Sequence, residues 1–268
     1  MQTFRRGAAL FDTGFHYVGA LDEGESLHTL FSYFDLMGLP WKKLDEDCFD
    51  EVVIGEDTFA FANKHQRFYE RMAARFPKER EGLKKYVDFL KGVGDHIFDA
   101  FKGDESKRHT YTLLSRSAYE FLNETIQNPL LRKVLSGTSL KMELNAPTLP
   151  LYTFAQINDS FIRSAWRLRG GGSQIADKLV EGIQAMGGEV KTRAAVTYIK
   201  ETDGKAAGVS INDEDYLEAD WIISSTHPAH TVSLVKDSKA MRSIYRNRIT
   251  RLENTFGMFT ANIRLKPG

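Results

Sequence analysis

The spacing of apolar positions predicts a helical middle for this chain. Between residues 26 and 166, apolar side chains recur mostly at intervals of three and four, which is the period of one helix face. Gly92 and Gly94 interrupt the longest periodic stretch, so a kink is expected there. A hairpin over residues 48–63, with its turn at 55–57, breaks the helical run. The predicted helices cover residues 26–38, 66–76, 79–101, 113–126, 129–136 and 153–166.

Both ends of the chain follow other patterns. Residues 1–20 predict a strand, a turn and a second strand. The segment from 170 to 188 predicts a glycine loop, a helix and a closing Gly187-Gly188 pair. Strands are then expected over 189–202, 206–212 and 216–225, followed by a helix that starts at residue 228 and a last strand over 254–268. Asp203-Gly204 predicts a hairpin turn, and the continuous apolar run ending the third strand predicts burial on both faces.

The order of these segments indicates the fold class. A β-rich start, a helical middle, a mixed segment and a final strand are typical of two domains that interrupt one another along the chain. We therefore predict an α+β fold with a discontinuous, two-domain organisation, and 268 residues suffice for both cores.

Composition excludes several classes of protein. Lys plus Arg equals Asp plus Glu at 36 each, which argues against nucleic-acid binding. The single cysteine, Cys48, excludes a disulfide framework and fits a reducing compartment. No apolar run approaches the roughly 18 residues that span a bilayer. We expect a cytoplasmic protein with at most peripheral membrane contact, whose eighteen Phe and ten Tyr suit a core or an apolar ligand chamber.

Two short polar stretches are candidate ligand contacts. Asp12, Gly14 and His16 form a turn between apolar runs, where the backbone often approaches a ligand closely, although an ordinary hairpin corner is the alternative. Ser225 and Thr226 follow an apolar strand, a usual place for ligand contacts, although a helix cap is the alternative.

The remaining polar clusters carry weaker signals. The glycines at 170–172 are consistent with a phosphate cradle, but we favour a hinge between domains. The basic run Arg163, Arg167 and Arg169 is interpreted as a solvated face. His227 and His230 have no evident third ligand, so no metal site is predicted. No combination of Ser, Cys, His and Asp is placed convincingly for hydrolysis.

Three segments, in order, resemble one flavoprotein family. They are "QTFRRGAALFDTGFHYVG", "RGGGSQIADKLVEGIQAMGGEVKTRAAVTYI" and "GKAAGVSIN…YLEADWIISSTHPAHTVSLV". Together they resemble the phytoene desaturase, carotenoid isomerase and retinol saturase type of FAD-dependent oxidoreductase, within the amine-oxidase superfamily. In the first segment the matching positions are Thr3, Gly7, Asp12, Gly14 and His16. Residues 26–160 match the family by their helical character and their length more than by any sequence motif.

The resemblance implies a cofactor and a reaction class. FAD would exchange hydride with a hydrophobic polyene such as a carotenoid or retinoid, in desaturation, saturation or isomerisation. The resemblance places Asp12, Gly14 and His16 along the isoalloxazine ring and the backbone of Val196 at the adenine edge. Ser225 and Thr226 are further candidate cofactor contacts. Catalytic residues are not identified.

The resemblance also implies a domain division. Residues 1–25 and 162–232 would form part of the FAD-binding domain, and residues 26–161 and 233–268 a largely helical substrate domain. The family's G-x-G-x-x-G loop and ribose-binding acidic residue would precede Thr3, and a closing flavin segment would follow Gly268. We therefore expect an internal part of a longer enzyme, which binds FAD weakly and is inactive alone. A non-catalytic apolar-ligand module and a flavin amine oxidase remain the alternatives.

Overall fold

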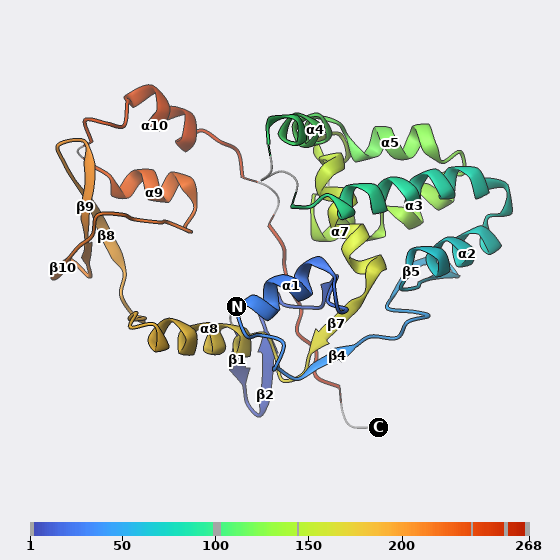
Figure 1. The fold of residues 1–268 in the computed structure, drawn as a ribbon, viewed down its shortest axis with the longest axis horizontal. Coiled ribbons are helices and arrows are strands. Elements are labelled where there is room, and N and C mark those ends of the chain that lie inside the picture. The colour runs from blue at the N-terminus through green and yellow to red at the C-terminus, as the bar shows by residue number, and fades with distance from the viewer. Residues whose placement is uncertain (1–2, 99–102, 144, 237, 255–256, 266–268) are drawn as a thin grey trace. The chain divides into compact units, whose positions relative to one another are not determined.

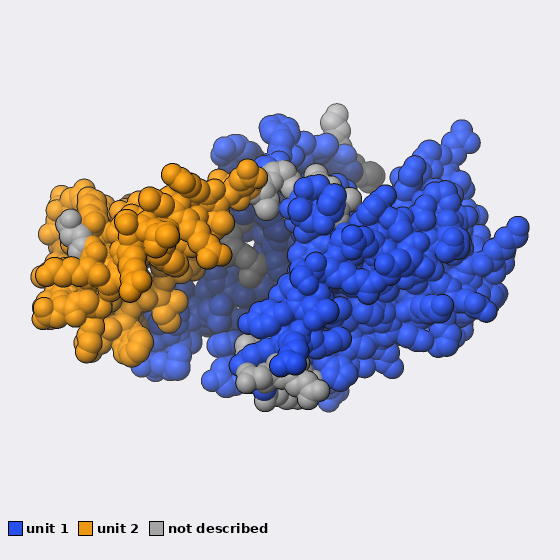
Figure 2. Space-filling model, turned by 90° about the horizontal axis from the view of Figure 1, so that it is seen from above, with its two compact units in different colours: residues 1–186, 256–268 blue, residues 187–255 orange. Residues whose placement is uncertain are grey.

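The computed structural model describes residues 3–98, 103–143, 145–236, 238–254 and 257–265. The chain divides into two compact units, unit 1 (residues 1–186 and 256–268) and unit 2 (residues 187–255), which Figure 2 colours separately. None of the helices in these described ranges combines the length and the apolar character that crossing a membrane requires.

The strands of unit 1 form small antiparallel sheets (Figure 1). A hairpin pairs β1 with β2, a second hairpin pairs β5 with β6, and β7 lies between β3 and β4. The glycine-containing turn between β5 and β6 is the one that the sequence predicts. The strands are β1 (Thr3–Arg6), β2 (Ala9–Asp12), β3 (Val18–Gly19), β4 (Trp41–Lys43), β5 (Asp50–Ile54), β6 (Asp57–Phe61) and β7 (Ala165–Leu168).

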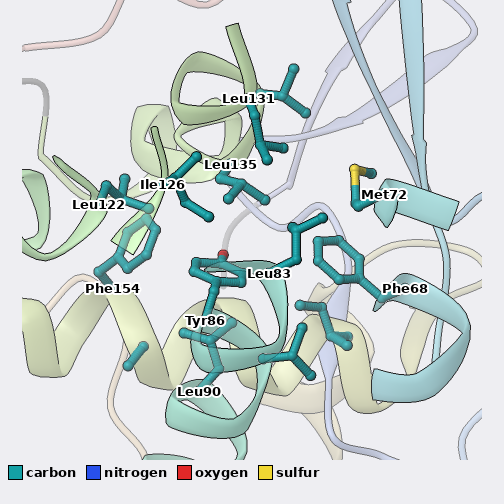
Figure 3. Close-up of a cluster of buried hydrophobic side chains, with 14 of the residues drawn as sticks. Phe68, Met72, Leu83, Tyr86, Leu90, Leu122, Ile126, Leu131, Leu135 and Phe154 are labelled. Atoms are coloured by element: carbon teal, nitrogen blue, oxygen red, sulfur yellow. The ribbon is translucent and has the colours of Figure 1, made fainter. Parts of the chain in front are cut away.

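Amphipathic helices enclose the core of unit 1 (Figure 3). Tyr86, Leu83 and Leu90 form the buried stripe of α3, and the ring of Phe154 on α7 lies 6.4 Å from that of Tyr86. Burial of each such side chain contributes roughly 1.5–3 kcal/mol. The helices are α1 (Ser26–Tyr33), α2 (His65–Arg75), α3 (Arg80–Asp95), α4 (Asp104–Ser115), α5 (Ala118–Thr125), α6 (Pro129–Leu135), α7 (Leu151–Arg163) and α8 (Ser173–Ala185), with single 3₁₀ turns η1 (Pro77–Glu79), η3 (Gly137–Lys141) and η4 (Ala146–Thr148).

A buried carboxylate joins helices α2, α3 and α7. Asp159 is 3% exposed at its side chain, and its oxygens lie 2.7 Å from His65 Nε2 and 2.5 Å from Arg163 Nε. Arg163 also donates to Asp95 at 2.6 Å. A Cβ at Gly94 would overlap the Asp159 carboxylate, so the glycine allows α3 to approach α7 this closely.

Unit 2 contains a three-stranded antiparallel meander, β8 (Val196–Thr202), β9 (Lys205–Ile211) and β10 (Asp215–Glu218), with helices α9 (Pro228–Leu234) and α10 (Ser243–Thr250) among its described residues. Asp203 and Gly204 join β8 to β9 with φ angles of 52° and 78°. Positive φ at both central residues is what a two-residue hairpin turn of type I′ requires, so the predicted hairpin is confirmed.

The fold is α+β, as the sequence predicts, but several element boundaries differ. The helix expected over 79–101 ends at Asp95, and the strand expected from residue 189 begins at Val196. The helix expected over 113–126 is divided between α4 and α5. Ser117 accepts a hydrogen bond from the backbone N–H of Tyr119, and this helix-capping contact starts α5 after an extended residue, Arg116.

One predicted strand is shorter than expected, and another is wrong. The strand expected over 216–225 ends at Glu218, and the apolar run beyond it is solvated, with Trp221 89% and Ile223 98% exposed. The Ala219 N–H still donates to Ala207 O of β9 at 3.2 Å, but no strand of the described part of unit 2 pairs with residues 220–225. A strand that is apolar on both faces needs cover on both. The described residues 257–265 of the expected last strand form no strand and are exposed.

Two glycines of α3 provide a matched pair for a stability test. Replacement of Gly94 with Ala should destabilise the protein by about 1–3 kcal/mol, because the added methyl group displaces a carboxylate held by His65 and Arg163. Gly92→Ala is the control, since a Cβ there meets no atom within 4 Å and removal of a helical glycine stabilises by roughly 0.5–1 kcal/mol. Urea unfolding followed by circular dichroism measures both. Equal stability of the two variants would contradict this account of the α3–α7 contact.

Candidate functional site

A hydrogen bond joins the predicted turn to the glycine loop. Asp12, the last residue of β2, accepts a hydrogen bond at 2.8 Å from the backbone N–H of Gly172, which lies 160 residues later. Gly170 and Gly171 have φ angles of 87° and 97°, which L side chains rarely adopt. A carboxylate at the N-terminus of α8 is also favoured by the helix dipole. The hydrogen bond from the Gly172 N–H to Asp12 therefore fixes the glycine loop to the end of β2. The loop and α8 both belong to unit 1.

A pocket of about 380 Å³ lies against this loop. It is lined by Leu10, Asp12, Lys42, Leu44, Arg167, Leu168, Arg169, Gly170 and Gly171. We call it the basic pocket, because three of its side chains are cationic and Asp12 is its one carboxylate. Lys42, Arg167 and Arg169 form no ion pair with any carboxylate of the described residues. Their charge is therefore available to an anionic or electron-rich ligand.

The pairing of β4 with β7 places two of these cations together. Lys42 lies directly opposite Arg167 in the antiparallel register. Like charges at directly opposed positions destabilise a sheet. An arrangement that is unfavourable by itself and faces a pocket is typical of a ligand site, where the ligand supplies the missing opposite charge.

The other predicted residues of unit 1 take different positions. Gly14 and His16 are exposed, they are not among the lining residues of the basic pocket, and their role beside a flavin stays a prediction. The prediction that Arg163, Arg167 and Arg169 form a solvated face is confirmed for Arg167 and Arg169, which are exposed, and wrong for Arg163, which is half-buried. Arg163 pairs with Asp159 and Asp95, while the other two line the basic pocket.

A cluster of titratable side chains lies just beyond the turn. The hydroxyl of Tyr17 donates to Asp50 Oδ2 at 2.5 Å, and Lys141 Nζ donates to the Tyr17 hydroxyl and to Asp50. The Lys141 ammonium also lies 4.0 Å from the centre of the Tyr17 ring. Burial and the neighbouring Asp50 carboxylate raise the pKa of Tyr17. Sequence reasoning missed this cluster, because its members come from separate segments.

The predicted residues of unit 2 form no common site in the described structure. Val196 starts β8 and pairs with Ile211. The Thr226 hydroxyl contacts Thr231 Oγ1 at 2.9 Å, and Ser225 is exposed. The residue that caps α9 is His227, whose ring accepts a hydrogen bond from the Ala229 N–H. The assignment of Val196, Ser225 and Thr226 to FAD stays a prediction, as does the domain division that joins residues 1–25 to 162–232.

An apolar groove of about 410 Å³ lies beside residues 17–20, directly after the turn. Its walls come from α1, α7 and residues 97–98 at the end of the α3 segment. The abundance of Phe and Leu in the helical middle predicts an apolar groove facing the Asp12–His16 turn, and Leu27 and Leu30 are among the residues that line this one. Most of the aromatic side chains of the helical middle fill the closed core instead, and Phe98 and Phe161 are the phenylalanines that line the groove.

Comparison with known proteins gives relatives of one kind. No family model matches the chain. It is 29% identical over 271 residues to the all-trans-retinol 13,14-reductase of Danio rerio, with 90% of this chain and 44% of the relative covered. It is 27% and 26% identical to the proteins of that name from Macaca fascicularis and Homo sapiens, with 78% of this chain and 38% of each relative covered. The chain thus spans less than half the length of these curated relatives.

Solved structures with a similar fold include one from an archaeon. It is described as an oxidoreductase from Methanosarcina mazei, and it matches with a TM-score of 0.56 and 18% sequence identity over 90% of this chain and 53% of the other. At this identity the likeness concerns the fold alone. The relatives named retinol reductases support the predicted resemblance to the retinol saturase type.

The raised pKa of Tyr17 predicts a pH dependence of stability. Above about pH 10 the unfolded chain loses the phenolic proton while the folded protein retains it, so folded stability falls as the pH rises. Tyr17→Phe removes this contribution, and the stability difference between wild type and variant should be constant up to about pH 9.5 and shrink above pH 10. One group contributes at most about 1.4 kcal/mol per pH unit, and partial exposure of Tyr17 lowers that figure.

Urea unfolding of both proteins at several values between pH 8 and pH 11 measures this difference. Tyr86, whose pKa is also raised by burial, is present in both proteins and cancels. A difference that stays constant to pH 11 would show that the Tyr17 phenol titrates normally.

Proposed function

We propose that the chain is part of a longer FAD-dependent oxidoreductase that reduces a carbon–carbon double bond of a retinoid or a related apolar polyene. The observation that carries the proposal is the basic pocket, in which Lys42, Arg167 and Arg169 surround a glycine loop held by Asp12. The resemblance of the Asp12 turn to a flavin-contact segment and the names of the curated relatives support the cofactor and the substrate class respectively.

The residues of the basic pocket fit a flavin. The pyrimidine edge of the ring and the pyrophosphate of FAD present oxygen acceptors and, in the reduced or ionised forms, negative charge. Lys42, Arg167 and Arg169 offer cationic donors, and Gly170 and Gly171 place no side chain between the loop and a ligand. These residues would hold the cofactor. When bound, a flavin supplies hydride transfer, and positive charge near its pyrimidine edge favours the reduced form.

The chain's own residues would then provide position and an apolar environment. Asp12 keeps the glycine loop in one conformation through the Gly172 N–H. The apolar groove would hold the hydrocarbon part of the substrate and keep water away from it. Residues 12–20 connect the basic pocket to the groove, so one short segment would contact both cofactor and substrate.

A non-catalytic module for an apolar ligand is the second candidate, because the groove alone would serve it. The two candidates differ in the need for the basic pocket. If the protein is the oxidoreductase, substitutions in the basic pocket must alter flavin binding. If it is a simple carrier, the same substitutions would leave binding of its apolar ligand unchanged.

The activity itself is tested with the protein expressed at the full coding length of its gene. The flavin of the purified protein is reduced under nitrogen, and all-trans-retinol is added. The expected product has gained two hydrogen atoms, seen as an absorption shift to shorter wavelength and by mass spectrometry. Full recovery of unchanged retinol, and of carotenoid substrates tested in the same way, from a protein that holds flavin would contradict the proposal.

Flavin binding gives a test that needs no turnover. The 268-residue chain should release FAD on gel filtration, since tight binding in this family draws on the G-x-G-x-x-G loop. Titration of FAD fluorescence should still detect weak binding, which Arg167→Gln or Lys42→Gln weakens about 10-fold through loss of a charge-assisted hydrogen bond.

Matched controls lie elsewhere on unit 1. Arg80→Gln and Lys133→Gln remove exposed cations that form no ion pair with the described residues, and they should leave the FAD affinity unchanged. A similar loss for all four variants would indicate only a general charge effect. Stoichiometric flavin retained by the unmodified chain would show that the cofactor site lies elsewhere.

A further inference from the structure

Positive charge gathers in residues 236–252 of unit 2, in a chain whose net charge is zero. The cations of this basic segment are Lys236, Lys239, Arg242, Arg246, Arg248 and Arg251. Asp237, which lies outside the described residues, is its one acidic residue. None of the cations forms an ion pair with a carboxylate of the described residues. Their charge is therefore available to a partner.

The acidic residues of unit 2 gather in a different segment. Those between residues 213 and 220, all exposed, are Asp213, Glu214, Asp215, Glu218 and Asp220. A surface that is merely solvated usually intersperses charges of both signs. Separation into an acidic and a basic segment is instead typical of a surface that meets a partner of opposite charge.

One cation of the basic segment fixes the orientation of α10. The Arg246 guanidinium donates to the carbonyl oxygens of Val232 and Val235, at the end of α9, at 2.7 and 2.6 Å. Arg246 and Ile249 are half-buried, whereas the other residues of α10 are exposed. Residues three apart lie on the same side of a helix, so the side of α10 opposite to these two faces solvent.

This outer face of α10 combines apolar and cationic side chains. Ile244 and Tyr245 are 76% and 52% exposed, and Arg248 follows Ile244 by one helical turn. Directly after the helix, Arg251 is exposed and Leu252 is 56% exposed. A helix that faces only water would carry polar side chains at these positions.

A hollow of about 480 Å³ extends the apolar surface beside α10. Its apolar lining comes from Val235, Met241, Ile244 and Tyr245. Glu201 is the one carboxylate among its lining residues, and it accepts hydrogen bonds from the backbone N–H groups of Lys239 and Ala240 at 2.8 and 3.3 Å. This carboxylate therefore holds the loop before α10 in place, beside the apolar lining.

We infer that the outer face of α10, with the cations of the basic segment, binds the surface of a lipid bilayer that contains anionic lipids. Long cationic side chains reach the headgroups, while Ile244 and Tyr245 enter the boundary between headgroups and acyl chains. Fluid headgroups can meet cations at any spacing, whereas an acidic protein would need carboxylates at matching positions. Duplex DNA would pair with the cations but offers no apolar layer to the other two side chains. The inference does not depend on the proposed function.

Cosedimentation of the 268-residue chain with vesicles measures this binding. The chain should bind vesicles of equimolar phosphatidylcholine and phosphatidylserine at least about 10-fold more tightly than vesicles of phosphatidylcholine alone. Raising the salt from about 0.1 M to about 1 M should release most of it, because the screening length falls from roughly 10 to 3 Å.

Variants of the outer face separate the two contributions. The double variant Arg248→Gln/Arg251→Gln should weaken binding at least about 10-fold, since each basic residue near an anionic surface contributes about 5-fold. Ile244→Ser should weaken it about 3- to 10-fold by removing apolar surface, and this loss should persist at high salt. All three side chains are exposed, and circular dichroism verifies that the variants are folded.

The matched control is Arg80→Gln/Lys133→Gln, which removes two exposed cations of unit 1 and should leave vesicle binding unchanged. Equal losses in the two double variants would show only an effect of net charge and overturn the inference. Absence of binding to the anionic vesicles would also overturn it, as would binding to duplex DNA that is equally tight and equally sensitive to Arg248→Gln/Arg251→Gln. The protein expressed at the full coding length of its gene must bind as well, since failure there would show that the face is covered.

Discussion

Both candidate pockets depend on the close approach of residues 19–22 to the C-terminal end of α7. The backbone N–H of Ala20 meets the carbonyl oxygens of Ser160 and Ser164 at 2.8 and 3.0 Å, and the next two N–H groups donate to the Ser164 hydroxyl. Gly19 makes the approach possible because any side chain there would overlap α7. Since β3 pairs with β7 at this point, the same contact contributes Gly19 and Ala20 to the lining of the apolar groove and positions the strand that leads to the glycine loop.

The sheet around β7 carries ion-paired side chains on one face and, on the other, cations that form no ion pair with the described residues. On one face, Asp22 accepts hydrogen bonds from Lys43 and Trp166, among others, and although burial opposes its ionisation these bonds lower the pKa of Asp22. The next residues along the same strands, Lys42 and Arg167, belong to the basic pocket and have no such partner among the described residues. Alternation along two short strands thus gives a neutralised face and a cationic face, in a chain with no net charge.

The sequence predicted those parts of the fold that depend on local patterns. Helical periodicity identified α2, α6 and α7, and the Asp203-Gly204 pair identified the β8–β9 turn, because neighbouring residues decide both. The opposition of Lys42 and Arg167 could not be predicted, since strands of three and four residues give no periodic signal and their register depends on distant contacts. Burial of residues 219–225 was predicted from hydrophobicity alone, which does not say whether another element covers the strand. For the site, the sequence pointed to Asp12, but it favoured a hinge for the glycine loop and did not predict the hydrogen bond that joins the two.

The backbone that lines the apolar groove at Gly19 and Ala20 has an evolutionary consequence. A surface made of side chains can be widened or narrowed by single substitutions, whereas the surface at Gly19 and Ala20 is set by backbone that lies on α7. If this groove binds the proposed substrate, changes in its fit are expected at side chains such as Leu30 and Phe98, which are partly exposed and not part of the closed core. The backbone at Gly19 and Ala20 would stay the same through such changes.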